Sequence, residues 1–417
     1  MERTDSLDVY YGAELVGTIH DASPVAFEYA PTWLYRAEPM TVAAIALQSG
    51  RADSAEVQAF FENLLPEGEL RHYLAEQRKA STLFAMLLEV AGDTAGGFVI
   101  VPGGQAPQPA TYEATSWEAM AAMLGKSSAS AIDIRGGDAR ISLAGAQDKT
   151  SIALFADDVP RLPMGTSPST HILKPDIRRL AKVWHSAANE AIVMRAAARC
   201  GLPTAEVFYE AHTQSCVVRR FDRIARPDGS LARLIQYDFC QLAGMVSEKK
   251  YEKEGGPDLA ACVDLIRRYS MQPALDLRNF VVWIFFNLYV GNNDSHAKNL
   301  SLYNVPGQGV MLTPFYDLMC TRMYPGLSQE FAFSLGGEFK PVSMTQEHLT
   351  AMAKQVGMRS QFLVRQAADL AVRLPGALEQ AVQEVKPTLP YSAKVLAERL
   401  QRFVLSTTKK TAARLTQ

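Results

Sequence analysis

The sequence predicts an α+β protein with two lobes, preceded by a small α+β domain. Short strand-like and helical runs come before a Gly/Pro-rich stretch at 102–109. Strand-like runs with one helix follow that stretch, and helical spacing of apolar residues dominates the rest of the chain. We therefore expect domains at 1–110, 125–235 and 236–417, the second a β-rich small lobe and the third a helical large lobe.

Composition sets the broad class of the protein. The 417 residues suffice for two or three domains that each have a core. Apolar residues make up 48% and charged residues 21%, which indicates a globular chain rather than a disordered one. The formal net charge is −2, so no electrostatic case for direct nucleic-acid binding follows. Any contact with DNA is expected to be indirect.

Cysteine usage and hydropathy bear on location. The five cysteines are scattered, and none forms a C-x-x-C pair, which indicates neither a disulfide framework nor a zinc site. The first residues lack the basic-then-apolar pattern of a secretory signal. The strongly apolar run at 280–290 is too short to span a membrane. We expect a cytoplasmic protein without membrane contact.

The first hundred residues resemble a separate unit, because the linker at 102–109 follows them. Expected strands are 7–11, 14–19 and 25–29, expected helices are 54–65, 68–79 and 82–91, and a glycine turn at 92–97 leads into a strand that ends at 101. Nothing in the composition of this region indicates a chemistry.

The pattern changes to strand, turn and strand from residue 132. A loop of small residues lies within 140–154, and 170–175 is a short strand that ends in Lys174-Pro175. A helix at 186–200 carries Glu190 near its start, and strands are expected at 205–211 and 215–221. Beyond 241, helices are expected at 258–269, 280–290, 346–356, 360–374, 377–385 and 392–415.

The most informative stretch is Gly291-Asn-Asn-Asp294-Ser-His-Ala-Lys-Asn299. The run before it is apolar on every side, which predicts a buried helix. Gly291 and the asparagines tolerate left-handed backbone angles and end that helix. Asp294 and Asn299 have the Asp-x-x-x-x-Asn spacing of a protein-kinase catalytic loop. Asp317, at the end of an apolar strand-like run, is a second candidate carboxylate. The pattern predicts an ATP-dependent phosphotransferase with a protein-kinase-like fold.

Phosphoryl transfer needs cations on the phosphate oxygens, groups that hold those cations, and a base beside the acceptor hydroxyl. Mg²⁺ prefers oxygen ligands, so Asn299 and Asp317 are candidate ligands. Asp294 would orient or deprotonate the acceptor hydroxyl, and Lys298 could offset developing charge.

The small lobe would bind the phosphates. Lys174 would neutralise the α- and β-phosphates, and Glu190 would hold that lysine. Backbone N–H groups of the Ala144-Gly145-Ala146 turn could cover the phosphates, since small side chains permit close approach.

Each of these residues also has an ordinary structural explanation. Asp294 alone is typical of a turn, Asp317 could end a strand, Lys174 alone would more often be a solvated surface lysine, and Glu190 suits the first turn of a helix. The order of the set along the chain favours the kinase interpretation. A P-loop ending in Lys149-Thr150 is excluded, because its two glycines would fall at Leu143 and Asp148.

Several motifs together resemble the HipA family of bacterial toxin serine/threonine kinases. Those motifs are Arg140-Ile-Ser-Leu-Ala-Gly-Ala-Gln-Asp-Lys149, Thr170-His-Ile-Leu-Lys174, Asn293-Asp-Ser-His-Ala-Lys-Asn299 and Leu312-Thr-Pro-Phe-Tyr-Asp317. The stretches Phe61-Glu-Asn-Leu-Leu-Pro-Glu-Gly68 and Gly92-Asp-Thr-Ala-Gly-Gly97 are similar to the N-terminal domain of that family. The resemblance covers nearly the whole chain.

The resemblance implies a role for each site residue. Asp294 would be the catalytic base, Asn299 and Asp317 the Mg²⁺ ligands, and Ser142 an inhibitory autophosphorylation site. A phosphoserine adds about −1.5 to −2 charge, which would repel ATP. The ATP contacts implied are Ala144, Gly145, Ala146, Gln147, Asp148, Lys149, Lys174, the hinge residues Tyr237, Asp238 and Phe239, and His296, Lys298, Asn299, Tyr316 and Asp317.

The resemblance also implies partners. Family members form type II toxin-antitoxin modules with a small helix-turn-helix antitoxin, HipB-like, that binds operator DNA. Well-studied members phosphorylate an aminoacyl-tRNA synthetase and induce growth arrest, or persistence. The aromatic at Tyr237 and the segment 320–344 depart from the family pattern, which leaves the protein substrate open.

Two other functions are compatible with the pattern. One is a catalytically silent corepressor subunit of an antitoxin–operator complex, although intact Asp294, Asn299, Asp317 and Lys174 argue against it. The other is a small-molecule phosphotransferase of the aminoglycoside-kinase type. The extra N-terminal domain and the Ser142 loop favour the protein kinase.

Overall fold

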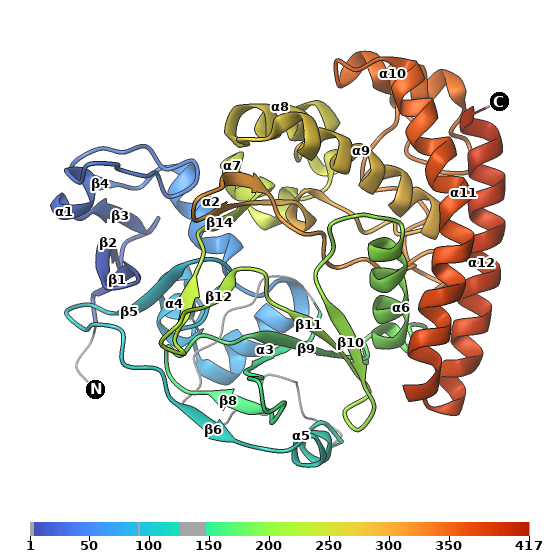
Figure 1. The fold of residues 1–417 in the computed structure, drawn as a ribbon. Helices are drawn as coiled ribbons and strands as arrows, with labels where there is room; N and C mark the ends of the chain where they lie inside the picture. Colours follow the sequence, from blue (N-terminus) through green and yellow to red (C-terminus); the bar gives the residue numbers. More distant parts are fainter. Residues whose placement is uncertain (1–3, 91, 126–146, 417) are drawn as a thin grey trace. The chain divides into compact units, whose positions relative to one another are not determined.

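The computed structural model describes residues 4–90, 92–125 and 147–416 (Figure 1). The chain folds into two compact units, and each is formed by two separate stretches of sequence. The first unit comprises Met1–Leu173 and Arg220–Glu248, and the second comprises Lys174–Arg219 and Lys249–Gln417. The domain limits expected from the sequence stay a prediction.

The first unit contains an antiparallel sheet of five strands in the order β4-β3-β2-β1-β5. The strands are β1 (Ser6–Tyr11), β2 (Glu14–His20), β3 (Ala26–Tyr29), β4 (Arg51–Ala52) and β5 (Phe98–Pro102). Gly17 in β2 is needed there, because a Cβ atom would lie 2.4 Å from the Glu28 carbonyl oxygen.

Helices cover the apolar side of this sheet. They are α2 (Ala55–Asn63), α3 (Gly68–Arg78) and α4 (Leu83–Val90), each within two residues of the expected limits, and the short α1 (Pro31–Leu34). Phe60 and Phe61 of α2 pack edge-on against each other, with ring centroids 5.0 Å apart, and both belong to the core under the sheet. Ile235 joins the same core from the second stretch of the unit.

The rest of the first unit is made of short elements. They are β6 (Tyr112–Ala114) paired with β8 (Arg161–Pro163), β7 (Thr150–Ile152) paired with the start of β9 (His171–Pro175), β12 (Arg223–Ala225) paired with β13 (Leu231–Arg233), β14 (Gln236–Asp238), α5 (Trp117–Leu124) and α7 (Phe239–Leu242). The sequence did not predict α5, which follows the linker.

A buried ion cluster joins the two stretches of the first unit. The carboxylate of Asp93 lies 3.2 Å from Arg220 Nη1 and 2.8 Å from Arg223 Nη2, and Asp222 pairs with Arg220 at 2.7 Å. Burial opposes the charged form of Asp93, but Arg220, Arg223 and Arg233 outweigh it and hold its pKa well below the ordinary value. The glycine turn predicted at 92–97 therefore binds residues more than a hundred positions away.

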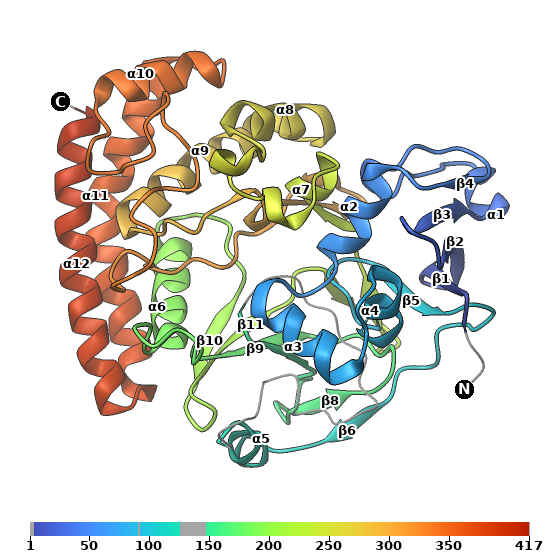
Figure 2. The same cartoon turned by 180° about the vertical axis from the view of Figure 1, so that it is seen from behind.

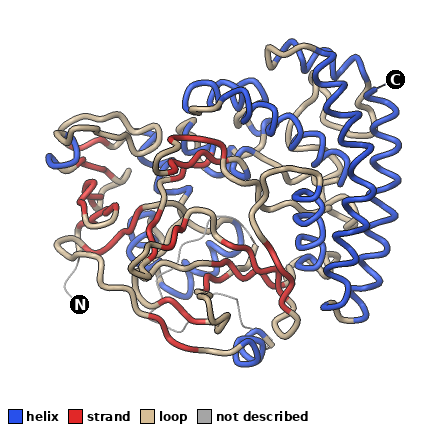
Figure 3. The backbone as a smooth tube through the Cα atoms, in the orientation of Figure 1, coloured by secondary structure: helices blue, strands red, loops and turns tan. Residues whose placement is uncertain are grey.

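The second unit is mainly helical (Figure 3). Its helices are α6 (Ser186–Arg199), α8 (Leu259–Tyr269), α9 (Pro273–Val290), α10 (Gln346–Gln355), α11 (Ser360–Val385) and α12 (Tyr391–Thr416), with 3₁₀ turns at Glu252–Glu254, Ala297–Asn299 and Lys386–Thr388. A further 3₁₀ turn, Ser247–Lys249, lies where the chain passes from the first unit to the second. Its strand pairs are β10 (Val207–Glu210) with β11 (Ser215–Arg219) and β15 (Ser301–Val305) with β16 (Gly309–Leu312).

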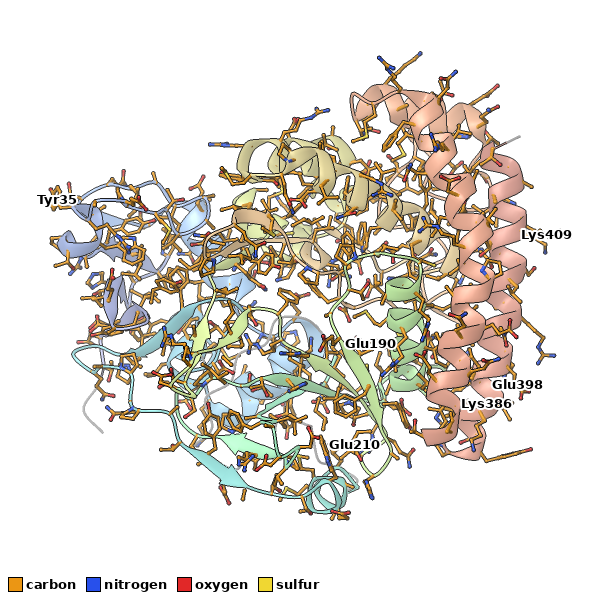
Figure 4. The ribbon with its side chains drawn as sticks, in the orientation of Figure 1. Tyr35, Glu190, Glu210, Lys386, Glu398 and Lys409 are labelled. Carbon is orange, nitrogen blue, oxygen red and sulfur yellow. The ribbon has the colours of Figure 1, made fainter. Side chains whose placement is uncertain are left out.

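Helices α11 and α12 run side by side, and α6 and α9 pack against them (Figures 1 and 2). Every third or fourth residue of α11 is buried, including Leu363, Leu370 and Leu378, which is the period of an amphipathic helix. Lys386 and Glu398 form an exposed ion pair of 3.0 Å near the loop between α11 and α12 (Figure 4).

Two predicted helix boundaries are wrong. The helix expected at 280–290 begins earlier, at Pro273 of α9. The sequence predicted separate helices at 360–374 and 377–385, because proline lacks an N–H and usually ends a helix. The structure has one helix, α11, with Pro375 inside it. The buried faces on both sides of Pro375 continue one apolar stripe, and this tertiary packing outweighs the lost backbone hydrogen bond.

All five cysteines are buried: Cys240 in the first unit, and Cys200, Cys216, Cys262 and Cys320 in the second. Burial raises the pKa of the Cys200 and Cys320 thiols to about 12 each. Among the residues that the structure describes, no helix combines the length and apolar character required to cross a bilayer.

Candidate active site

The second unit holds the loop that follows α9. Gly291 ends the helix with φ +75°, as the sequence predicted, and its N–H donates to the Asn287 carbonyl. The Asn292 side chain donates to Asn287 Oδ1 at 2.8 Å, and the Asn293 N–H donates to Thr321 Oγ1 at 2.8 Å. The loop is therefore fixed to a helix that is almost completely buried over Phe280–Val290.

Asp294 is the most exposed member of this loop. Its side chain is 57% exposed, whereas His296, Lys298 and Asn299 are all buried. The Asn299 Nδ2 donates to the Asp294 carbonyl at 2.9 Å, and the His296 N–H donates to the same oxygen at 3.1 Å. The backbone of Asp294 is thus held from inside the loop while its carboxylate reaches the surface.

Lys174 lies in a buried ion pair. Its Nζ donates to Glu190 Oε1 at 2.6 Å, and Glu190 projects from α6 (Figure 4). Burial disfavours the ammonium, but attraction to Asp317 and Glu190 outweighs it and raises the pKa of Lys174 above its ordinary value. The pairing expected between Lys174 and Glu190 is confirmed, and a solvated surface lysine is excluded.

Asp317 contacts the same lysine from another part of the chain. Its Oδ1 lies 2.8 Å from Lys174 Nζ, and its side chain is 40% exposed. It does not end a strand, as the sequence suggested, because β16 stops at Leu312. Asp317 instead has φ +60°, a left-handed conformation that is uncommon for residues other than glycine and is tolerated by Asp and Asn.

Two contacts join Asp317 to the loop after α9. The Tyr316 hydroxyl donates to the Lys298 carbonyl at 2.8 Å, and Asn292 Nδ2 lies 3.5 Å from the Asp317 carbonyl. The structure therefore places Lys174 in direct contact with Asp317 and links the Asp317 segment to the loop that carries Asp294 and Asn299.

Asn189, next to Glu190, fixes the chain after Asp317. Its side-chain amide donates to the Cys320 carbonyl at 3.0 Å and accepts from the Cys320 N–H at 2.9 Å. It thus pairs with Cys320 as a neighbouring β-strand would. The two consecutive residues Asn189 and Glu190 position the Asp317 segment and Lys174, respectively.

The chemistry of these donors fits Mg²⁺ and a triphosphate. Asp317 offers a half-exposed carboxylate, and Asn299 Nδ2 is bound to Asp294, which leaves its oxygen as the acceptor atom of the amide. Oxygen ligands in small number suit Mg²⁺, which keeps waters and phosphate oxygens as its other ligands. In the described part of the chain, no group of three or more His, Cys, Asp or Glu side chains could hold a metal ion.

The other predicted nucleotide contacts belong to the first unit. Lys149 is buried directly before β7, and Gln147 and Asp148 are partly buried. Ser142, Ala144, Gly145 and Ala146 lie outside the described residues.

The hinge residues have side chains engaged within the first unit. The Tyr237 ring lies 5.8 Å from Phe60, and its hydroxyl donates to the Thr41 carbonyl at 3.0 Å. Asp238 caps α7 by accepting from the Gln241 N–H at 2.8 Å, and Phe239 is fully buried. A nucleotide contact at this segment would use its main chain, and it stays a prediction.

Sequence reasoning missed Tyr251, whose hydroxyl donates to Asp294 Oδ1. Tyr251 lies 43 positions before Asp294 in a charged stretch, Glu248-Lys-Lys-Tyr-Glu-Lys-Glu254, that has no strand or helix period. No signal in the sequence marks it.

Family models match most of this chain. The model described as the HipA-like C-terminal domain matches residues 141–385, and the model described as the HipA N-terminal domain matches residues 7–101. The candidate kinase Y4mE of Sinorhizobium fredii is 32% identical over 407 residues, which cover 93% of this chain and 94% of that protein. The serine/threonine-protein kinase toxin HipA of Shewanella oneidensis is 28% identical over 403 residues, or 92% of this chain and 91% of that protein.

A solved structure is similar to this chain over nearly its whole length. The complex of Shewanella oneidensis HipA with HipB and its operator DNA contains a chain that superposes with a TM-score of 0.83 and 25% identity, over 98% of this chain and 99% of that one. This match confirms the predicted α+β, two-lobed kinase-like fold with an added N-terminal domain. By its family models and its relatives, the chain belongs to the HipA family of toxin kinases.

Proposed function

We propose that this protein is an ATP- and Mg²⁺-dependent serine/threonine protein kinase, the toxin of a type II toxin-antitoxin module. The observation that carries the proposal is the buried Lys174, whose ammonium lies 2.6 Å from the Glu190 carboxylate and 2.8 Å from the Asp317 carboxylate. A metal-bound triphosphate requires a charged lysine for its phosphate oxygens and a carboxylate for its metal ion. Lys174 and Asp317 are groups of these two kinds.

In this proposal the Lys174 ammonium would neutralise phosphate oxygens. Glu190 would keep that ammonium in place when the Asp317 carboxylate binds the metal ion instead of the lysine. Asn299 and Asp317 would hold Mg²⁺, which supplies charge stabilisation on the phosphate oxygens. Lys174 and Asp317 are already neighbours, so cation and lysine would act on one triphosphate.

Asp294 would serve as the base. The acceptor oxygen would form a bond to the γ-phosphorus, the bond from that phosphorus to the β–γ bridging oxygen would break, and ADP would leave. The proton of the acceptor hydroxyl would pass to the Asp294 carboxylate. The exposure of that carboxylate supports an acceptor on another protein, because a large substrate has to reach it from outside.

The relatives and the resemblance suggest how this activity is used. Ser142 would be phosphorylated by the protein itself, and the added charge beside the nucleotide would switch off the kinase. A HipB-like helix-turn-helix antitoxin would bind the kinase, and DNA would be contacted only through it, in keeping with a net charge of −2. The target would be a cytoplasmic protein, with an aminoacyl-tRNA synthetase as the first candidate.

The test is incubation of the full-length protein with Mg·ATP and a bacterial lysate, followed by phosphopeptide mass spectrometry. Three proteins are compared: wild type, Asp294→Asn, and Asp264→Asn as a matched control. Asp264 is 77% exposed and lies on α8, apart from the site residues. We expect phosphate on Ser142 and on one dominant host protein with wild type and the control, and a loss of about a hundredfold or more with Asp294→Asn.

Two other results would redirect the proposal. Consumption of ATP without any phosphoprotein would favour a small-molecule phosphotransferase. No ATP turnover, together with tight binding to an antitoxin–operator complex, would favour the corepressor function.

A further inference from the structure

The exposed carboxylate of Asp294 has a partner outside its own loop. The Tyr251 hydroxyl donates a hydrogen bond to Asp294 Oδ1. Tyr251 belongs to a turn at 249–256 that precedes α8, and both residues lie in the second unit.

The turn is attached to the loop by more than this hydrogen bond. The Ala297 N–H donates to the Lys250 carbonyl at 3.2 Å. The Tyr251 ring meets the His296 ring edge-on, with centroids 5.0 Å apart and planes at 89°. A backbone bond and a ring contact therefore fix the direction from which the hydroxyl approaches Asp294.

The turn is also rigid in itself. The N–H groups of Glu254 and Gly256 both donate to the Tyr251 carbonyl at 3.0 Å. Gly256 is required, because a Cβ atom there would lie 2.0 Å from the Lys249 carbonyl oxygen. The backbone that carries the Tyr251 ring thus has little freedom to shift.

A second tether holds the far side of the turn. The Glu252 carboxylate accepts from the Ser334 N–H at 2.7 Å and from Ser334 Oγ at 2.6 Å. Lys253 pairs with Glu330 in the same neighbourhood. The turn is thus bound both to the loop of Asp294 and to 330–334, within the segment that departs from the family pattern.

An exposed aspartate on a loop ordinarily exchanges between side-chain rotamers. The Tyr251 hydroxyl is fixed by the packing of its ring and by the turn that carries it, so its hydrogen bond keeps the Asp294 side chain in one rotamer. A carboxylate has about four lone-pair sites, so this hydrogen bond fixes the group without using up its capacity to accept a proton. The angle of a base toward its substrate matters strongly, since small misplacements reduce rates steeply.

We propose that Tyr251 is a positioning residue for Asp294: its hydroxyl holds the carboxylate in the orientation from which it accepts the proton of the substrate hydroxyl. The inference rests on the proposed kinase function and adds to it. Tyr251 would act through Asp294 rather than on the substrate itself.

The test is a double-mutant cycle with Tyr251→Phe and Asp294→Asn, read as kcat and as KM for ATP. Phenylalanine keeps the ring contact with His296 and removes only the hydroxyl. We expect Tyr251→Phe to lower kcat about tenfold or more and to leave KM for ATP within about twofold, because Lys174 and Asp317 are unchanged. In the Asp294→Asn background the same substitution should change kcat by less than about twofold.

The control is Tyr269→Phe, the same chemical change on a tyrosine at the end of α8, with thermal melting run on every variant. The inference would be overturned if Tyr251→Phe left kcat unchanged, or if it lowered kcat equally in the wild-type and Asp294→Asn backgrounds. The kinase function would still stand in that case, because the wild type would be active. A wild type that transfers no phosphate would overturn the kinase function and this inference together.

Discussion

The Lys174 ammonium lies 2.8 Å from the Asp317 carboxylate, although 143 positions separate the two residues in the chain. One comes from strand β9 and the other from a loop beyond β16. Their contact places a candidate phosphate-binding group beside a candidate metal ligand.

Replacement of Lys174 by methionine tests the buried ion pair. The Glu190 side chain is only 2% exposed and would lose its cation, so we expect the free energy of unfolding to fall by about 3 kcal/mol. Denaturant titration measures this, with Lys182→Met, an exposed lysine, as control. The double variant Lys174→Met/Glu190→Met should regain most of the stability and still transfer no phosphate. If the single variant were as stable as the control, the buried pair would not contribute as we describe.

Two substitutions at Asp317 distinguish the effect of its backbone conformation on stability from the effect of its charge on phosphate transfer. Asparagine tolerates φ +60°, whereas alanine should be destabilised by about 1 kcal/mol relative to asparagine. Both should lower phosphate transfer by about a hundredfold or more, because both remove the carboxylate. Melting curves and Mg²⁺-dependent kinase assays provide the measurements. Retained activity in Asp317→Asn would argue against a metal-binding role.

The ion cluster of the first unit predicts a pH dependence of stability. The pKa of Asp93 is depressed in the folded protein, so its contribution is complete above the unfolded value of about 3.9 and is lost as the pH falls from there toward the folded value. At pH 7, Asp93→Asn should lower the free energy of unfolding by about 3 kcal/mol or more, since the buried Arg220 and Arg223 and the partly buried Arg233 lose a counterion.

The difference between wild type and Asp93→Asn should narrow as the pH is lowered below about 4, because Asp93 then takes up a proton in the unfolded chain while it stays charged in the folded protein. Unfolding by denaturant at several pH values shows whether it does. Asp21→Asn, at an exposed aspartate of the same unit, should be indistinguishable from wild type. A difference that stayed constant with pH would show that the charge of Asp93 is not the source of its effect.

Two glycines of the second unit should respond to alanine in opposite directions. Gly376 lies inside α11, and a Cβ atom there would meet nothing within 4 Å, so Gly376→Ala should stabilise by about 0.5–1 kcal/mol. Gly256→Ala should destabilise, because the added atom would overlap the Lys249 carbonyl. Thermal melting of both variants measures these changes in stability. A destabilised Gly376→Ala would contradict the absence of neighbouring atoms around the added Cβ atom.

Much of the fold could be predicted because its signals are local. The turns at Gly291 and the helix starts are encoded by the residues at those positions, and α6, α8 and α10 begin and end within one residue of their expected limits. The helix that continues through Pro375 could not be predicted, since its packing on α6 and α9 outweighs the local preference of proline.

The candidate site divides in the same way. Asp294 and Asn299 were found from their spacing, and Lys174 from its place in the order of motifs. The contacts of Asn189 with Cys320 and of Tyr251 with Asp294 could not be found, because each joins segments that are far apart in the chain and that have no pattern in common. Positioning groups of this kind become visible only when tertiary structure supplies their partners.

The thiols offer a reporter that needs no engineering. The thiolate is the form of cysteine that attacks an alkylating reagent, so buried thiols with a raised pKa should stay unmodified in the folded protein at neutral pH. Cys240 alone belongs to the first unit, whereas the other four belong to the second. A brief alkylation pulse during unfolding, read peptide by peptide, would therefore reveal which half of the molecule opens first.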